Sequence, residues 1–452
     1  MDYSKMTLES STLSPAETIE ISQDAAEYLN AGDSPDDIII SCGRNKAKAR
    51  VVIMNEEGMH ARMSADLFST LCLPADFPVA LHIKKKADEW TVGPVICLLT
   101  EIQETEPRFG SVQAFCKLLA LEFQKKHAIF YVSSIKDFCT ETATGYFYNS
   151  GDWHKHTAPL PDIIHNRIHI RKNEQSEVFQ SIKRGLRTEQ ILIFNDHYLD
   201  KWLTHQLLQS FPHLHPYLPE TMLFAEENQL KDYLIAKNEL FLKPVHGSQG
   251  KRIFKLDRHE GTVKVNYSSS KSGKTIEYSD FEEMYNEIKK LITKEPYLIQ
   301  QAIPLLCYYG KPIDFRLLCY RSAKGKWQVS SSVARMTGEH TFVTNLAQGG
   351  KLFPVFLVLE DLFDRREAYH LKKFMYEAAI HVSDSLSAML EGVFAEFAID
   401  MALDVNGRPW VLEVNTKPSK RDLDADAAVP PSVLSIARIC MDYCGFFNKS
   451  KA

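Results

Sequence analysis

The sequence lacks the features that mark several protein classes. Its 452 residues contain no apolar run near the ~20 residues that a membrane-spanning helix needs. The start, MDYSKMTLESSTLSPAE, has neither the basic nor the apolar segment of a signal peptide. The nine cysteines form no CxxC pair and are odd in number, so we expect reduced thiols in an intracellular protein. The net charge of −5 gives no electrostatic reason to expect binding to nucleic acid or an anionic membrane.

The length allows two or three domains, and the first ninety residues contain an internal repeat. Residues 21–43 and 63–85 align without gaps. Each unit combines a short helix led by a serine, a turn with proline and an alternating strand. Two such halves predict a small pseudo-symmetric β-barrel, of the double-psi kind.

A different rhythm begins at Gly93. VGPVICLLT is typical of a buried strand, SVQAFCKLLALEFQKKH of an amphipathic helix and AIFYVSS of a second strand. Strand, helix and strand in that order predict a parallel α/β layer. From Phe194 onward the pattern is α+β. We therefore predict domains at 1–92, 93–194 and 195–452, the last with a nucleotide flap at about 220–300 and a catalytic part at about 301–452.

The stretch FLKPVHGSQGKRI has the composition of an anion site. Its strand ends at Lys243, and a loop with Gly247, Ser248 and Gly250 follows. Glycines allow positive φ and close approach of backbone N–H groups to an anion, and the lysines add charge. The Walker A pattern is absent. A glycine-rich hairpin turn with solvated lysines is the alternative interpretation.

Two later strands carry polar side chains among apolar neighbours. YLIQQAIPL could offer backbone groups to an adenine edge, or it could simply be a core strand. In KPIDFRLLCY, Asp314 and Arg316 share one face of a strand, where Asp suits ribose hydroxyls and Arg suits phosphate or carboxylate. A surface ion pair would explain them equally well. Arg335 lies on the next strand, and the loop GEHTFVTNLAQGGK, with Asn345, is of a kind that often holds substrate.

The hairpin AIDMALDVNGRPWVLEVN places three oxygen-bearing side chains at one end. Glu413 and Asn415 are two residues apart and face the same side of a strand, and the turn brings Asp400 beside them. Oxygen donors of this kind are the ligands that Mg²⁺ selects. Two buried carboxylates side by side also repel unless a cation neutralises them. Polar strand ends at a sheet edge are the alternative.

Taken in order, these motifs resemble the ATP-grasp fold over about residues 94 to 420. That resemblance implies a parallel pre-ATP-grasp domain plus two α+β subdomains, ATP as cosubstrate and Mg²⁺ as cofactor. DKWLTHQLL is similar to the lysine-bearing helix start of D-alanine–D-alanine ligases. The implied nucleotide-binding residues are Lys201, Lys243, Gly247, Ser248, Gly250, Gln300, Gln301, Ile303 and Asp314. The implied metal ligands are Asp400, Glu413 and Asn415.

One position departs from those ligases. They carry an arginine two residues before the first metal-binding Asp, where this sequence has Ala398. The resemblance then leaves Arg335, Arg316 or both to supply positive charge to the transferring phosphoryl group, with Asn345 and the Gly349-Gly350 pair shaping the acceptor pocket.

The whole length resembles the YheC/YheD family of endospore coat-associated ATP-grasp proteins, through VGPVICLLT, YFYN, LPDIIHNRIHIR and IFNDHYLDKW. The resemblance implies a sporulation setting, in the mother-cell cytoplasm or on the spore coat, with other coat proteins as partners. ATP-grasp chemistry implies a ligase that forms a C–N bond through an acyl phosphate. The carboxylate donor and amine acceptor stay open among amino acids, peptides and coat proteins. A catalytically silent coat protein and a kinase are the alternatives.

Overall fold

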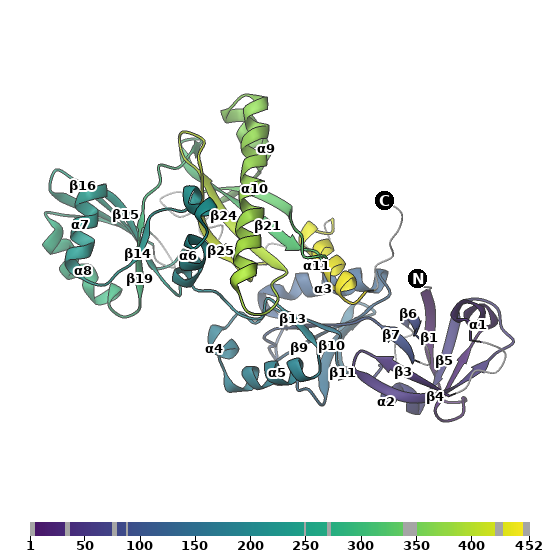
Figure 1. Ribbon diagram of the computed structural model, residues 1–452. Coiled ribbons are helices and arrows are strands. Elements are labelled where there is room, and N and C mark those ends of the chain that lie inside the picture. Colours follow the sequence, from purple (N-terminus) through teal and green to yellow (C-terminus); the bar gives the residue numbers. More distant parts are fainter. Residues whose placement is uncertain are drawn as a thin grey trace.

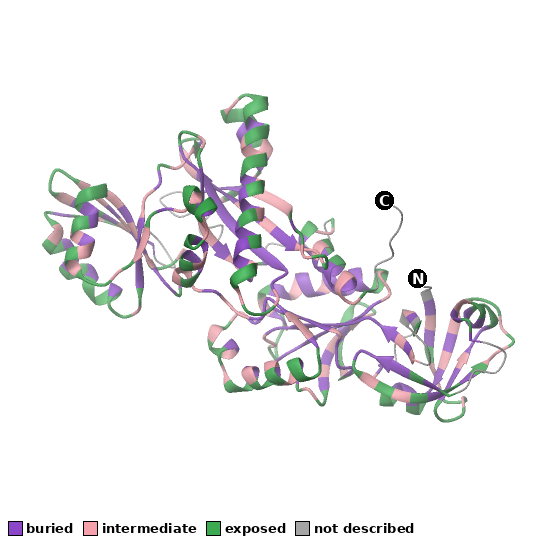
Figure 2. Cartoon of the chain, in the orientation of Figure 1, coloured by how far each residue is buried: buried purple, intermediate pink, exposed green. Residues whose placement is uncertain are grey.

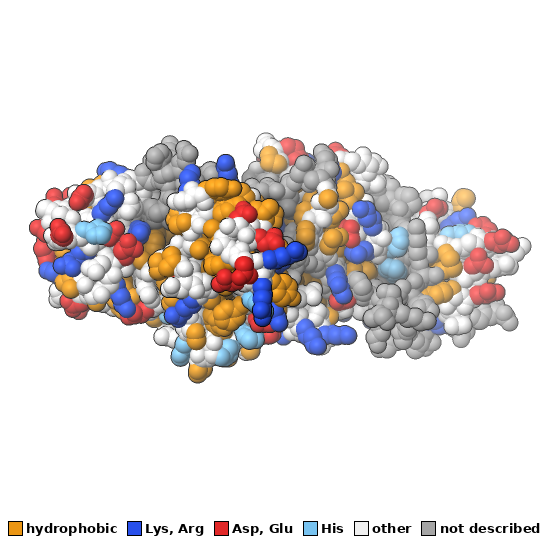
Figure 3. Space-filling view, turned by 90° about the horizontal axis from the view of Figure 1, so that it is seen from above, with side chains coloured by type: hydrophobic (Ala, Val, Ile, Leu, Met, Phe, Trp, Pro, Cys, Tyr) orange, Lys and Arg blue, Asp and Glu red, His pale blue; other side chains and the backbone are white. Residues whose placement is uncertain are grey.

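The computed structural model arranges four β-sheets and their helices along one elongated molecule (Figure 1). The structure describes residues 5–31, 37–74, 79–86, 89–247, 250–268, 273–337, 350–420 and 428–445. Within those ranges, no helix combines the length and the apolar character needed to cross a bilayer. Figure 3 shows basic, acidic and apolar side chains intermixed on one face, so that face presents no field of a single sign.

The first sheet is a closed barrel with strand order β1-β5-β2-β4-β3-β7-β6, which confirms the predicted barrel-like unit. The two repeats occupy equivalent places, because Ser22 and Ser64 each precede a short helix that leads into a strand. The double-psi arrangement stays a prediction. The barrel elements are β1 (Lys5–Ser11), β2 (Thr18–Ile21), α1 (Gln23–Leu29), β3 (Ile38–Cys42), β4 (Asn45–Ile53), β5 (His60–Ser64), α2 (Ala65–Thr70), β6 (Val79–Lys86) and β7 (Glu89–Gly93).

The second sheet has the order β11-β10-β9-β8-β12-β13. Strands β9, β8, β12 and β13 run parallel, as the strand–helix–strand pattern predicts. Every residue of β8 and β9 is buried, which fits parallel strands covered on both faces. Its elements are β8 (Val95–Leu99), η1 (Gly110–Val112), α3 (Gln113–Lys125), β9 (Ile129–Ser133), β10 (Ala143–Asn149), β11 (Asp152–Ala158), β12 (Ile163–Asn166), α4 (Arg171–Glu174), α5 (Glu177–Thr188) and β13 (Leu192–Phe194).

The third sheet is antiparallel, with the order β14-β19-β15-β16-β17-β18. Helices α7 and α8 cover one of its faces and share its hydrophobic core (Figure 1). The elements from the end of the second sheet through the third are α6 (Lys201–Gln209), η2 (Pro212–Tyr217), β14 (Thr221–Leu223), α7 (Glu227–Lys237), β15 (Glu239–Pro244), β16 (Ile253–His259), β17 (Thr262–Ser268), β18 (Gly273–Tyr278), α8 (Phe281–Ile292) and β19 (Tyr297–Gln301).

The fourth sheet has the order β23-β22-β21-β24-β25, with β20 paired to β21. The long helix α10 packs against it through Met375, Ala378 and Val382. Strand β25 is the edge strand and lies near α6. The elements are β20 (Cys307–Tyr308), β21 (Lys311–Arg321), β22 (Trp327–Met336), β23 (Lys351–Pro354), α9 (Val355–Leu362), α10 (Arg365–Met389), β24 (Glu396–Leu403), β25 (Pro409–Asn415) and α11 (Pro431–Tyr443).

Some hydrophobic cores contain residues from more than one sheet. One cluster of buried side chains contains both barrel residues and residues of the second sheet, including Val95, Cys97 and Tyr131. Another joins α3 of the second sheet to the C-terminal helix α11, through Phe115 and Ile436. Figure 2 shows the central strands of the sheets largely buried and the outer faces of the helices exposed. The barrel and the second sheet therefore share apolar contacts along their junction.

Candidate functional site

A cavity of about 230 Å³ is lined by residues of α6, β15, β19 and β25 together with the loops beside them. Two lysines from different elements, Lys201 and Lys243, line it with Gln300. Glu413 and Asn415 of the edge strand line it as well. Gly247 is a further lining residue, so the structure brings six predicted site residues from distant parts of the sequence around one space.

Lys201 is the first residue of α6. The helix begins here because Asp200 caps it, its carboxylate accepting a 2.8 Å bond from the Leu203 N–H. The Lys201 ammonium donates to the carbonyl of Gly247, the first glycine of the predicted flap, and lies 3.2 Å from the Glu413 carboxylate. Lys201 therefore links the flap to the edge strand of the fourth sheet.

Lys243 lies near the end of β15 and donates a 2.5 Å bond to the side-chain oxygen of Gln300 on the neighbouring strand β19. The Gln300 amide in turn donates 2.9 Å to Thr221. Burial lowers the pKa of Lys243 to about 8; the Glu413 carboxylate opposes that shift and the Lys201 ammonium adds to it. A lysine with this pKa is still charged at pH 7 and can bind phosphate oxygens.

Gly247 also lines the cavity, whereas the predicted nucleotide-binding residues Gln301, Ile303, Gly250 and Asp314 lie outside its lining. Gln301 faces away from Gln300 along β19 and accepts a bond from the Glu220 N–H. Ile303 is buried just beyond that strand. Gly250 has φ +67°, a positive value that glycine tolerates, whereas the φ of Gly247 is not positive. Ser248 lies outside the described residues.

Four charged side chains form a second cluster on the fourth sheet. Arg335 binds both oxygens of Asp314 at 2.6 Å, and these two residues face each other across β21 and β22. Arg316 binds both oxygens of Asp400 at 2.7 Å, and a nitrogen of Arg335 lies 3.1 Å from Asp400. The pairing of Asp314 is thus with Arg335 rather than with Arg316.

The pKa values follow from these ion pairs. Burial alone would raise the pKa of Asp400, but Arg316 and Arg335 hold it down at about 2. Burial would likewise lower the pKa of Arg335, yet Asp400 and Asp314 raise it further above its usual value. Asp400 and Arg335 are therefore both ionised near neutral pH.

The resemblance to the ATP-grasp fold implies Mg²⁺, and the donor set at the predicted metal position fits this ion. Asp400 and Glu413 face each other directly across β24 and β25, and the Asn415 amide nitrogen lies 3.5 Å from an Asp400 oxygen. All three carry an oxygen donor on one face of the hairpin. Their charge needs no ion, however, because Arg316, Arg335 and Lys201 balance the two carboxylates.

The sequence has Ala398 where related ligases carry an arginine, and two predicted arginines, Arg316 and Arg335, lie beside Asp400. Ala398 is fully buried opposite Leu318 and Asn415. Arg316 reaches Asp400 from the neighbouring strand β21, and Arg335 reaches it from β22, one strand further away. The predicted acceptor residue Asn345, with Gly349, lies outside the described residues.

Sequence reasoning missed a group of cavity residues from the second sheet. His169, Arg171 and Tyr198 line the cavity, and His246 joins them from the β15 loop. The first three follow the ends of β12 and β13. The stretch LPDIIHNRIHIR carried the available signal, since several basic residues directly after a parallel strand mark the edge where ligands bind in α/β sheets.

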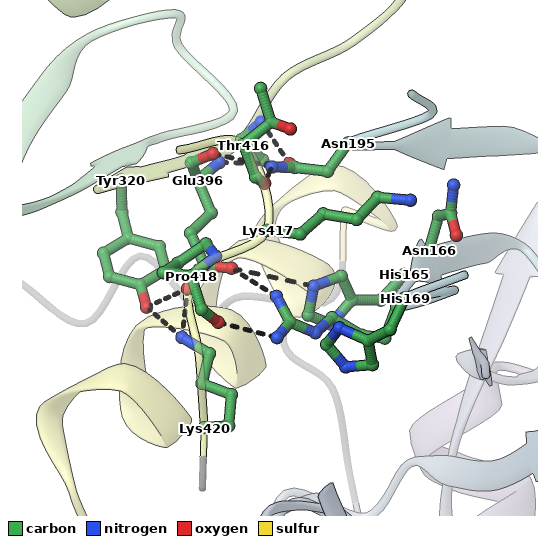
Figure 4. A network of polar contacts seen from close by, with 12 residues as sticks. His165, Asn166, His169, Asn195, Tyr320, Glu396, Thr416, Lys417, Pro418 and Lys420 are labelled. Carbon is green, nitrogen blue, oxygen red and sulfur yellow. Dashed lines mark hydrogen bonds and ion pairs between the residues drawn. The ribbon is translucent and has the colours of Figure 1, made fainter. Parts of the chain in front are cut away.

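A buried polar network surrounds Glu396 and the chain that follows β25 (Figure 4). Glu396, at the start of β24, accepts from the Tyr320 hydroxyl at 2.5 Å and from the ammonium of Lys420. Arg167 lies 3.4 Å from Glu396 and donates 2.7 Å to the carbonyl of Pro418. All of these groups are buried. They tie the chain after β25 to the second sheet.

Lys417 and Asn195 complete the network. Lys417 donates to Glu174 of α4 and to the carbonyl of Ile168. Asn195 donates to the carbonyls of Glu396 and Thr416. Burial lowers the pKa of both Lys417 and Lys420 to about 8. Because removing one partner of a buried pair costs about 3–5 kcal/mol, this network fixes the end of β25 in one position.

Comparison with known sequences places the chain in a family. A family model described as YheC/D like ATP-grasp matches residues 190–447. The chain is similar to the endospore coat-associated protein YheD of Bacillus subtilis (strain 168), at 30% identity over 368 residues, covering 79% of each chain. It is also similar to the endospore coat-associated protein YheC of the same strain, at 24% identity, covering 62% of this chain and 77% of that protein.

Solved structures similar to this chain include the VanG D-Ala:D-Ser ligase from Enterococcus faecalis, at 12% identity and a TM-score of 0.47, covering 78% of this chain and 99% of that one. The ATP-grasp ligase PsnB is similar at 13% identity and a TM-score of 0.43, covering 76% and 99%. The sequence matches decide the assignment: the chain has the ATP-grasp fold and belongs to the YheC/D-like ATP-grasp family.

Proposed function

We propose that this ATP-grasp protein is an ATP- and Mg²⁺-dependent ligase that joins a carboxylate to an amine. The observation that carries the proposal is the cavity in which Lys201, Lys243 and Gln300 meet Glu413 and Asn415. Two cations and two oxygen donors around one space suit a triphosphate with its metal ion. A purely structural protein has no need of them.

The phosphates would bind Lys201 of α6 and Lys243 of β15. Lys201 would exchange its contact with Gly247 for a phosphate oxygen. Adenine would lie along the segment from Gln300 to Ile303. Asp314 could bind ribose only by giving up an oxygen that Arg335 now holds, so its first role in this proposal is to orient Arg335.

Asp400, Glu413 and Asn415 would hold Mg²⁺, which when bound offsets the charge on the transferring phosphoryl group. In the reaction, a substrate carboxylate oxygen attacks the γ-phosphorus and ADP leaves. The amine then attacks the acyl carbon, phosphate leaves, and the amine loses a proton. Asp314 orients Arg335, and Asp400 would share its oxygens between Mg²⁺ and Arg316, so that both arginines would lie ready to stabilise the developing charge.

The names of the curated relatives support a sporulation setting for this chain. We place it in the mother-cell cytoplasm and on the assembling spore coat, with coat proteins as partners. The acyl acceptor is then an amino acid, a peptide or a coat protein.

Incubation of the purified protein with ATP, Mg²⁺, amino-acid pools and coat-protein extract tests the proposal by mass spectrometry. A ligase releases ADP and phosphate only when both a carboxylate and an amine are present, and a new amide appears. A phosphorylated product would instead make the protein a kinase. A Lys243→Met variant should be inactive, while the matched change at the exposed Lys251 should not alter turnover. Absence of any turnover would favour a structural coat protein.

A further inference from the structure

One wall of the cavity comes from the second sheet and takes no part in the proposed nucleotide contacts. His169 and Arg171 follow the carboxyl end of β12, and β8 lies beside it in parallel. From β8 the chain crosses through α3 to β9 on the other side, so the carboxyl ends of β8 and β12 flank the point where strand order reverses. Ligands of open parallel sheets bind at such points.

Arg171 is held in place without a charged partner. Its guanidinium forms no hydrogen bond or ion pair with any residue that the structure describes, and it lies 5.3 Å from the centre of the Tyr198 ring. Tyr198 is itself anchored, because its N–H donates 2.9 Å to Glu174 and its hydroxyl lies 3.4 Å from His169. A half-buried arginine stacked on a fixed ring keeps its donors available to a ligand.

The backbone beneath Arg171 is fixed as well. The carboxylate of Glu101, just after β8, accepts bonds of 2.9 to 3.1 Å from the N–H groups of His169 and Ile170. Glu174 also binds Lys417 of the buried network. The loop after β12 is therefore held in place on both sides of Arg171, by Glu101 and by the contact of Glu174 with Lys417, which follows β25.

The balance of charge in the cavity calls for an anion. Three Lys and Arg side chains line it, namely Arg171, Lys201 and Lys243, against the single carboxylate of Glu413. Lys201 already lies 3.2 Å from Glu413, and Lys243 is assigned to the nucleotide. Of the three cations that line the cavity, Arg171 alone has neither a carboxylate partner among the described residues nor an assigned role in nucleotide binding.

We infer that Arg171, supported by Tyr198 and His169, binds an anionic group of the substrate, separate from the nucleotide. This deepens the proposed function and rests on it, since it names the substrate class: a molecule that carries a carboxylate or a phosphate at this end. An arginine fork matches either group in a bidentate geometry.

The test uses the full chain with the non-hydrolysable nucleotide AMPPNP and Mg²⁺, and two anion probes, glutarate and inorganic phosphate. The thermal midpoint is measured with and without each probe for wild type, Arg171→Ala, Arg171→Lys and Lys172→Ala. Lys172 is the matched control, because it is the next residue, carries the same positive charge, is exposed and lies outside the cavity lining. Calorimetry gives the AMPPNP affinity of each variant.

At least one probe should raise the midpoint of wild type and of Lys172→Ala, because a ligand that binds only the folded state stabilises it. Arg171→Ala should lower the affinity for that probe by about tenfold or more, which is the usual effect of losing a pair of charge-assisted hydrogen bonds. The affinity for AMPPNP should stay unchanged. Arg171→Lys should retain part of the effect. A response to glutarate alone identifies a carboxylate, and a response to phosphate alone identifies a phosphate.

Three results would overturn the inference: no response of wild type to either probe, an equal response in Arg171→Ala, or a fall of AMPPNP affinity in Arg171→Ala, which would assign Arg171 to the nucleotide. Failure of the proposed function is a separate result. If AMPPNP does not bind wild type at all, the ligase proposal falls, and the same probes without nucleotide still decide the role of Arg171.

Discussion

The pKa of Lys243 gives the sharpest test of the nucleotide site. Burial places this pKa at about 8 in the free protein, against an ordinary value of 10.5. Bound phosphates favour the charged lysine and should move its pKa back toward that ordinary value. The lysine is then charged below pH 8 with or without ATP. Above pH 8, however, Lys243 is mostly neutral in the free protein, so ATP binding has to be accompanied by protonation of Lys243.

ATP affinity should therefore be highest below pH 8 and fall as pH rises through that value. At pH 9 about nine in ten free Lys243 side chains are neutral, so the apparent affinity should be about tenfold lower than at pH 7. The phosphates of ATP lose their last proton near pH 6 and add little to this change.

The assay is calorimetric titration with AMPPNP and Mg²⁺ at pH 7, 8 and 9. Lys243→Arg should flatten the profile, because arginine stays protonated throughout. Lys251→Arg is the control and should leave the wild-type profile intact, since Lys251 is exposed on the same loop. Equal pH profiles in wild type and Lys243→Arg would refute the reasoning and remove Lys243 from the phosphate site.

Three further predictions concern other parts of the structure. Glu413→Gln should change the free energy of unfolding by under about 1 kcal/mol, since its pair with Lys201 is partly exposed, but it should reduce the effect of Mg²⁺ on ATP affinity measured by calorimetry. Asp400→Asn should cost about 3–5 kcal/mol in urea unfolding, because Arg335 stays buried without its full countercharge; with a folded pKa of about 2, the wild-type contribution is present above the unfolded pKa of 3.8 and is lost as pH falls toward 2. A chain that starts at Pro94 should still bind ATP but with a lower thermal midpoint, because it exposes the apolar contacts shared with the barrel; complete loss of binding in a folded truncated chain would contradict this.

Local patterns in the sequence were sufficient for the fold class. The apolar run of β8, the helical spacing of α3 and the buried run of β9 predict a parallel layer, and the structure has it. The hairpin of β24 and β25 follows from two apolar runs around a tight turn, and its register places Asp400 opposite Glu413. Such features depend on residues close in sequence, so periodicity and turn chemistry determine them.

Tertiary structure alone decided which charges meet. Asp314 and Arg316 share a strand and look like partners in the sequence, yet each binds a residue of a different neighbouring strand. Arg171 lines the cavity, and Lys417 reaches Glu174, only because the second sheet packs beside the end of β25. These contacts are set by sheet order and by the packing between sheets, which no spacing along the chain encodes. The physical reason is that an ion pair needs only two side chains within a few ångströms, whatever the length of chain between them.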